Sequence, residues 1–151
     1  MKLIITKFGG TSVGTIDRIK SVAVKIKNEV KNGYNVIVVV SAMAGETNRL
    51  IKLVESLTND YRTSEYDTVI SSGEQVTSGL LAIALNELEI KSKSYQAWQI
   101  PFETDNNFSK ANIKEIKQDK ILFDLKDGYV IVVPGFQGCL LYTSPSPRDS
   151  R

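Results

Sequence analysis

The chain has 151 residues, of which 42% are hydrophobic and 24% charged, an ordinary composition for about one globular domain. Its net charge of +2 arises from 19 basic and 17 acidic residues without a basic block, so neither nucleic acid nor a membrane is indicated as a partner. The chain has no histidine and one cysteine, Cys139, which excludes histidine-based catalysis, histidine metal ligation and a disulfide framework within it. No apolar run is long enough for a signal peptide or a membrane span, so a cytoplasmic location is expected.

The first half of the chain alternates between strand-like and helix-like patterns. Leu3–Phe8 is expected to be a strand, and apolar residues at helical spacing predict a helix from about Thr15 to Lys31. The β-branched run Val36–Val40 is typical of a strand that is buried on both faces of a parallel sheet. Helices are then predicted near Asn48–Leu57 and over Ser64–Leu88.

The second half contains shorter elements that continue the alternation. The sequence predicts a strand over Lys91–Ala97, a polar loop over Thr104–Lys110, a weak strand over Ile113–Ile116, a short helix over Asp119–Lys126 and a strand over Tyr129–Val133. Such alternation predicts an α/β domain with a mainly parallel sheet. Ligands bind such sheets at the carboxyl ends of the strands, so we expect the glycine-containing turns after Phe8, Val40 and Val133 to share that edge.

The turn after the first strand carries the strongest chemical signal. Lys7-Phe8-Gly9-Gly10-Thr11-Ser12-Val13 places two adjacent glycines between a strand and a helix. Adjacent glycines let the backbone approach a ligand closely. The N–H groups of the turn and of the helix N-terminus form an anion site, with Lys7 as a counter-charge, and this arrangement suits nucleotide phosphates. The alternative for Lys7 is a solvated lysine at a strand end.

Four segments in this order and spacing resemble the signature of aspartokinases, which are members of the amino acid kinase family. They are Lys7–Val13, Val39-Val40-Ser41-Ala42-Met43, Ser72-Gly73-Glu74 and Pro134-Gly135-Phe136-Gln137-Gly138. The resemblance covers residues 2–138. It implies a three-layer α/β/α sandwich with a mainly parallel sheet (the amino acid kinase fold, truncated), in which residues 1–138 are the N-terminal part of the catalytic domain.

The resemblance implies transfer of the γ-phosphoryl group of ATP to the side-chain carboxylate of L-aspartate, with Mg²⁺, as the first step of lysine, threonine and methionine biosynthesis. A carboxylate nucleophile with a reference pKa of about 3.9 is already ionised at neutral pH and needs no general base. Phosphoryl transfer mostly requires positioning and neutralisation of charge, so the lack of histidine is no objection. A homo-oligomer is expected for the full-length parent.

The same resemblance implies roles for eight residues and for no metal ligand. Lys7 is implied to be catalytic and to bind ATP, together with Phe8, Gly9, Gly10 and Ser41, whereas Ser12, Thr47 and Glu74 are implied to bind the substrate. Glu74 is expected in the first turns of a long helix and to contact the α-ammonium group of aspartate. Its alternative is an ordinary first-turn glutamate that complements the helix dipole. The alternative for Ser12, Ser41 and Thr47 is a helix-capping hydroxyl.

The last thirteen residues, 139–151, depart from the family. Aspartokinases continue after the Gly-Phe-Gln-Gly turn into a Gly-Arg-Gly-Gly-Ser-Asp segment, whose arginine serves the substrate α-carboxylate. Here Pro145 and Pro147 oppose both helix and strand. The run resembles the read-through of a sequencing adapter, so a non-native tail is expected, and the alternative is a genuine disordered tail. We expect this fragment alone to be inactive.

Two other functions stay open. One is a non-catalytic module from a genuine truncation that binds anions or pairs with another subunit, and the other is a kinase of the same fold that acts on another carboxylate. Dinucleotide binding is disfavoured, because no Gly-x-Gly-x-x-Gly pattern follows the first strand.

Overall fold

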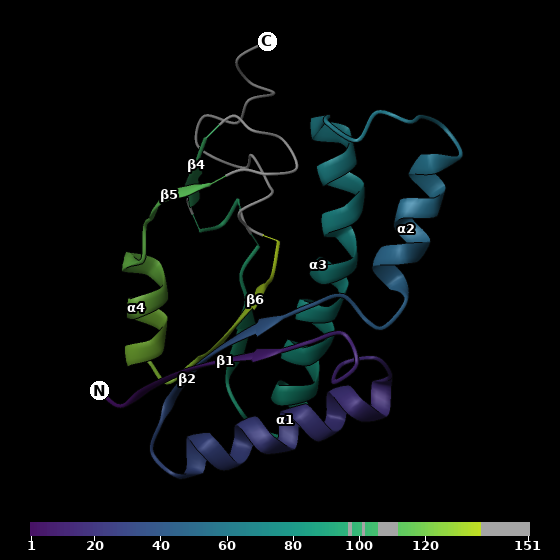
Figure 1. Cartoon of the computed structure of the whole chain (residues 1–151). Helices are drawn as coiled ribbons and strands as arrows, with labels where there is room; N and C mark the ends of the chain where they lie inside the picture. The colour runs from purple at the N-terminus through teal and green to yellow at the C-terminus, as the bar shows by residue number, and fades with distance from the viewer. Residues whose placement is uncertain (97, 101, 106–111, 137–151) are drawn as a thin grey trace.

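The computed structural model describes residues 1–96, 98–100, 102–105 and 112–136 (Figure 1). At its centre lies a four-stranded parallel sheet with the strand order β1-β2-β6-β3. These strands are β1 (Leu3–Phe8), β2 (Asn35–Val40), β6 (Val130–Pro134) and β3 (Ser92–Ser94). A separate antiparallel pair consists of β4 (Phe102–Thr104) and β5 (Ile113–Ile116).

Helices cover both faces of the parallel sheet (Figure 1). They are α1 (Ile16–Lys31), α2 (Glu46–Glu55), α3 (Ser64–Glu87) and α4 (Asp119–Lys126). Helices α1 and α3 contribute to one buried cluster with alternate residues of β2 and β6, and α4 contributes to a second cluster on the other face. The result is three layers, which confirms the predicted α/β/α sandwich with a mainly parallel sheet.

The alternation of side chains along β2 and β6 explains why both faces are filled. Val36, Val38 and Val40 of β2 belong to the cluster on the α1–α3 side. Ile131 and Val133 of β6 lie on the α4 side, since successive residues of a strand point to opposite faces. All residues of β6 are buried, as expected for a central strand of a doubly covered sheet.

Most predicted elements are confirmed, with bounds that shift by a few residues. Strand Leu3–Phe8 and helix Asp119–Lys126 agree in full, while α2 starts at Glu46 because Gly45 serves as its N-cap with a φ of 81°. In the first turn of α2, the Arg49 guanidinium donates hydrogen bonds to both carboxylate oxygens of Glu46, at 2.9 and 2.7 Å.

Two predictions in the second half need correction. The strand predicted over Lys91–Ala97 is shorter, because the chain turns after Tyr95 and the Gln99 N–H donates to the carbonyl of Gln96 at 2.9 Å. Strand β4 was not predicted, since its short sequence forms a strand only through its pairing with β5. Ala97, most of the predicted loop over 104–110, the end of the 134–138 turn and residues 139–151 lie outside the described residues. None of the helices in the described part is long and apolar enough to cross a membrane.

Candidate functional site

The three turns identified from the sequence lie side by side at the carboxyl edge of the sheet. In the parallel register Phe8 pairs with Val40, and Val40 pairs with Pro134. The Ser41 N–H donates to the Phe8 carbonyl at 3.1 Å, and the Gly135 N–H donates to the Val40 carbonyl at 2.8 Å. This edge is where α/β folds bind ligands, and the prediction that the turns share it is confirmed.

The two glycines of the first turn have different surroundings. A Cβ atom on Gly9 would meet nothing within 4 Å, so the backbone here is open to a ligand. A Cβ atom on Gly10 would lie 3.0 Å from the carbonyl oxygen of Ala42, so glycine lets the first turn pack against the second. Val13, which is fully buried, anchors the end of the loop. The turn is therefore closed on the protein side and accessible at Gly9.

Lys7 and Phe8 end β1 on opposite sides of the chain. Phe8 packs against the buried cluster under α1 and α3, so only its backbone faces the edge. Lys7 is exposed, and its positive charge is one of the influences that lower the pKa of Glu74. Among the described residues it forms no ion pair with a carboxylate. Lys7 is thus a cation at the mouth of the site.

Glu74 lies in the middle of α3, and the prediction that it lies in the first turns is wrong. Helix α3 begins at Ser64, as predicted, where the Thr63 side chain caps it by accepting a hydrogen bond from the Tyr66 N–H at 3.2 Å, and Glu74 lies well beyond its first turns. The acidic residues of the first turn are Glu65 and Asp67. The alternative that Glu74 complements the helix dipole is therefore wrong, since that effect is confined to the first turn.

The Glu74 carboxyl is buried, with only 4% of the residue exposed. Burial raises its pKa to about 7, although a hydrogen bond from the Ala42 backbone N–H and the charge of Lys7 both lower it. Within the described residues its Oε2 atom has no hydrogen-bond partner. An unpartnered buried carboxylate oxygen is costly, and a cationic ligand would relieve that cost.

Gly135 packs directly against this carboxyl, and Gly73 lets α3 pack against the second turn. A Cβ atom on Gly135 would lie 3.0 and 3.1 Å from the two carboxylate oxygens of Glu74. A Cβ atom on Gly73 would lie 3.1 Å from the Cβ atom of Ala42. Next to Gly135, Phe136 has a φ of 46°, a left-handed conformation that is costly for a bulky residue and is concentrated at functional sites. The third turn is therefore shaped around Glu74.

The three hydroxyl residues of the prediction do not cap helices. Thr15 caps α1, because its Oγ1 atom accepts a hydrogen bond from the Arg18 N–H at 3.2 Å, and Ser12 lies outside that cap. Helix α2 is preceded by Gly45, with no side-chain cap, so Ser41 and Thr47 have no such role. Ser41 begins the second turn, and Thr47 is half-buried in the first turn of α2. The capping alternative is thus wrong for all three residues.

Ala42 is the site residue that the sequence did not single out. Its N–H donates to Glu74, its carbonyl oxygen is the atom nearest to Gly10, and its methyl group lies against Gly73. Only the small side chain and the position after β2 hinted at this, because the contacts come from segments far apart in the sequence. Ala42 joins the first turn, the second turn and α3 at one point.

A second polar group, formed by the buried Tyr95 and Asp124 and the partly exposed Lys93, lies on the α4 face of the sheet. Lys93 Nζ donates to Asp124 Oδ1 at 2.8 Å, and the Tyr95 hydroxyl donates to Asp124 Oδ2. Burial and the hydrogen bond to Asp124 raise the pKa of Tyr95 to about 12. Burial raises the pKa of Asp124, but the hydrogen bonds from Lys93 and Tyr95 prevail and lower it. Both carboxylate oxygens are satisfied, so this group fastens α4 to the sheet.

In the described ranges no group of three or more histidine, cysteine, aspartate or glutamate side chains is placed to hold a metal ion. At the strand edge the Glu74 carboxyl is held against Gly135 and Ala42. This donor set among the described residues does not fit a protein-bound metal ion.

The α/β/α sandwich has glycine turns and the buried Glu74 carboxyl where its parallel strands end. This arrangement corresponds to a known class of kinases. The family model of the amino acid kinase family matches residues 2–143, and the chain belongs to that family. The aspartokinase of Rickettsia felis is 53% identical over 141 residues, which cover 91% of this chain and 35% of that protein. The chain thus spans about a third of the length of the curated relatives it matches.

Solved structures agree with this assignment. The aspartate kinase from Synechocystis has a TM-score of 0.75 and 37% identity, over 88% of this chain and 21% of that one. E. coli aspartokinase III, solved in complex with aspartate and ADP, has a TM-score of 0.72 over 90% of this chain and 41% of its own. Its 20% identity shows the shared fold alone.

Proposed function

We propose that this chain is the N-terminal, substrate-side part of an aspartate kinase catalytic domain, spanning residues 1–138. The parent enzyme transfers the γ-phosphoryl group of ATP to the side-chain carboxylate of L-aspartate, in the cytoplasm, at the start of lysine, threonine and methionine synthesis. The 53% identity to an aspartokinase over 91% of the chain supports this substrate pair over others of the same fold.

The single observation that carries the proposal is the buried carboxyl of Glu74. It has an oxygen without a partner in the described part of the chain, and it lies at the strand edge near the positive charge of Lys7. An α-ammonium group supplies the donors that this oxygen lacks and stabilises the ionised form. We therefore assign Glu74 to the α-ammonium group of aspartate, with Ser12 and Thr47 as further substrate contacts.

The first turn is assigned to the phosphates of ATP. Gly9 leaves its backbone open, Gly10 lets the turn approach Ala42, and Lys7 brings a positive charge to the same edge. The backbone of Phe8 and the side chain of Ser41 complete the nucleotide side of the site. Lys7 neutralises charge on the equatorial oxygens of the transferred group, which is the main requirement of phosphoryl transfer.

The reaction balances without a proton transfer at the acceptor. An oxygen of the aspartate side-chain carboxylate forms a bond to the γ-phosphorus of ATP, and the bond from that phosphorus to the β,γ-bridging oxygen breaks. ADP leaves with the bond's electron pair. We propose that Mg²⁺ accompanies ATP through the phosphate oxygens and water, as is usual for this ion.

The 151-residue chain is proposed to be inactive by itself, because it spans about a third of the length of its relatives. Formation of aspartyl phosphate by the purified chain that is lost in Lys7→Met would contradict this proposal. The same result would favour a complete catalytic site within these residues.

A transplant tests the parent activity. Residues 2–136 replace the matching segment of the Rickettsia felis aspartokinase, and ADP formation is measured with L-aspartate, L-glutamate and succinate as acceptors. Activity with L-aspartate alone supports the proposal. Preference for another carboxylate would favour the kinase of different specificity, and a folded but inactive transplant would favour the non-catalytic binding module.

A further inference from the structure

Arg18 links α1 to the first turn of the site. It is the third residue of the helix, and its Nη1 atom donates a hydrogen bond to the Thr11 carbonyl oxygen at 2.9 Å. The Gly14 N–H donates to the same oxygen at 3.4 Å, which is a weaker contact. The guanidinium of Arg18 is therefore the main donor to this carbonyl, although it comes from a position seven residues further along the chain.

The carbonyl that Arg18 contacts belongs to a turn with free N–H groups. The Ser12 N–H donates to the Gly9 carbonyl at 2.9 Å and so closes the turn. Among the described residues, the N–H groups of Gly9, Gly10 and Thr11 donate to no acceptor. Three successive backbone donors are therefore available to an anion at the place that Arg18 holds.

The charge of Arg18 lies where a helix disfavours a cation. The N-terminus of a helix carries a partial positive charge, which a carboxylate such as that of Asp17 complements and a guanidinium does not. In the described part of the chain no ion pair neutralises Arg18. Lys7 precedes the same turn, so two cations lie beside it. A bound anion would offset the cost of both charges.

From these contacts we propose that Arg18 is a positioning residue for the triphosphate of ATP. Its hydrogen bond fixes the Thr11 carbonyl and thereby keeps the turn in the conformation that leaves the N–H groups of Gly9 and Gly10 free for phosphate oxygens. A preformed set of donors binds an anion without the cost of ordering the loop. The inference rests on the proposed function, because it takes the first turn as the phosphate site.

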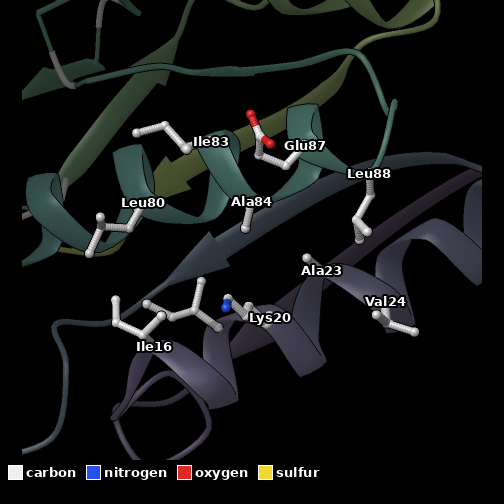
Figure 2. Close-up of a pocket in the computed structure, with 10 residues that line it drawn as sticks. Ile16, Lys20, Ala23, Val24, Leu80, Ile83, Ala84, Glu87 and Leu88 are labelled. Atoms are coloured by element: carbon white, nitrogen blue, oxygen red, sulfur yellow. The ribbon is translucent and has the colours of Figure 1, made fainter.

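The test compares Arg18→Met with the matched control Lys20→Met. Each variant removes one positive charge from the first half of α1 and keeps a long side chain. Lys20 lines the groove between α1 and α3 instead of contacting the turn (Figure 2). A difference between the two variants therefore measures the contact with Thr11 and not the loss of charge alone. Thermal unfolding verifies that both chains stay folded.

Amide hydrogen exchange in the 151-residue chain measures the hold on the turn directly. In Arg18→Met the Ser12 N–H is expected to exchange about fivefold faster, because the turn opens more often once the Thr11 carbonyl is released. Lys20→Met is expected to leave this rate within about twofold of the original. A Ser12 rate that is unchanged in Arg18→Met would overturn the proposal.

ATP kinetics in the transplanted kinase measure the consequence for the nucleotide. Arg18→Met is expected to raise the KM for ATP about fivefold, with kcat and the KM for L-aspartate within about twofold, because only the binding of the phosphates is weakened. Lys20→Met is expected to leave all three constants within about twofold of the original. Equal changes in the two variants, or an equal rise in both KM values, would overturn the proposal.

Lys7→Met separates a failure of this inference from a failure of the proposed function. If Lys7→Met lowers activity and Arg18→Met leaves the KM for ATP unchanged, the role of Arg18 is overturned and the phosphate site stands. If neither variant changes the use of ATP, the assignment of the first turn to the phosphates is itself wrong.

Discussion

Gly135 and Glu74 meet so closely that a single added methyl group would touch both oxygens of the carboxylate, at 3.0 and 3.1 Å. The two residues come from β6's turn and from α3, far apart along the chain. The contact shows that the glycine of the third turn sets the position of the Glu74 carboxyl, because any larger residue must displace it.

In the transplanted kinase, Gly135→Ala is expected to weaken the binding of L-aspartate more than the binding of ATP. The added Cβ atom pushes the Glu74 carboxylate from the position that receives the α-ammonium group, so the KM for L-aspartate should rise about tenfold or more. The KM for ATP should change much less, because the added atom lies on the side of Glu74. An equal rise in both constants would mean that the third turn shapes the whole edge and not the aspartate subsite.

Glu74→Gln is expected to stabilise the unliganded chain above pH 7. The carboxyl has a pKa of about 7 in the fold against 4.5 when unfolded, so between these values the folded chain holds a proton that the unfolded chain has lost. Stability then falls as pH rises, by up to about 3 kcal/mol, and Gln removes this loss. Urea unfolding of both chains at pH 4.5 and pH 8 measures it. A difference between the two chains that does not change with pH would contradict the raised pKa.

Tyr95→Phe is expected to lower the free energy of unfolding by about 1.5–3 kcal/mol at pH 7, because Asp124 loses one of its two charge-assisted hydrogen bonds while it stays buried. Urea unfolding gives the value. Tyr34→Phe is the control, since the described residues give its hydroxyl no hydrogen bond, and its effect should stay within about 0.5 kcal/mol. Equal effects for both variants would show that Asp124 does not depend on Tyr95.

Two glycines of α3 form a matched pair. A Cβ atom on Gly79 would meet nothing within 4 Å, so Gly79→Ala should stabilise the chain by roughly 0.5–1 kcal/mol through helix propensity. A Cβ atom on Gly73 would lie 3.1 Å from the Ala42 Cβ and 3.2 Å from the Glu46 Cγ. The free energy of unfolding of Gly73→Ala should therefore be lower than that of Gly79→Ala by about 1 kcal/mol or more, as measured by thermal unfolding. Equal gains would mean that α2 and α3 can separate slightly without cost.

Much of the fold follows from local patterns, since the β-branched run of β2 and the apolar spacing of α1 mark their elements without tertiary information. The edge at which the turns meet also follows, because parallel strands align their carboxyl ends. Strand β4 and the early end of β3 do not follow, since both depend on partners distant in the sequence.

Some residues of the candidate site could likewise be predicted from local sequence patterns, and others could not. The sequence predicts Lys7, Gly9 and Gly10 as site residues, because a strand followed directly by a glycine turn is a local pattern. The mid-helix position of Glu74 follows from the predicted helix over Ser64–Leu88, and the expectation that Glu74 lies in the first turns was inconsistent with that range. Ala42 was missed because its role consists of backbone and methyl contacts with Gly10, Gly73 and Glu74.

The affinity for L-aspartate at two pH values, in the transplant with Glu74 and with Gln at that position, tests the central claim most directly. If the ionised Glu74 carboxylate holds the α-ammonium group, a pKa of about 7 means that L-aspartate binds about tenfold more weakly at pH 6 than at pH 8. The Gln variant should bind weakly at both values, with ATP affinity retained. An aspartate affinity that does not depend on pH or on Glu74, or a loss shared equally by ATP, would contradict the account.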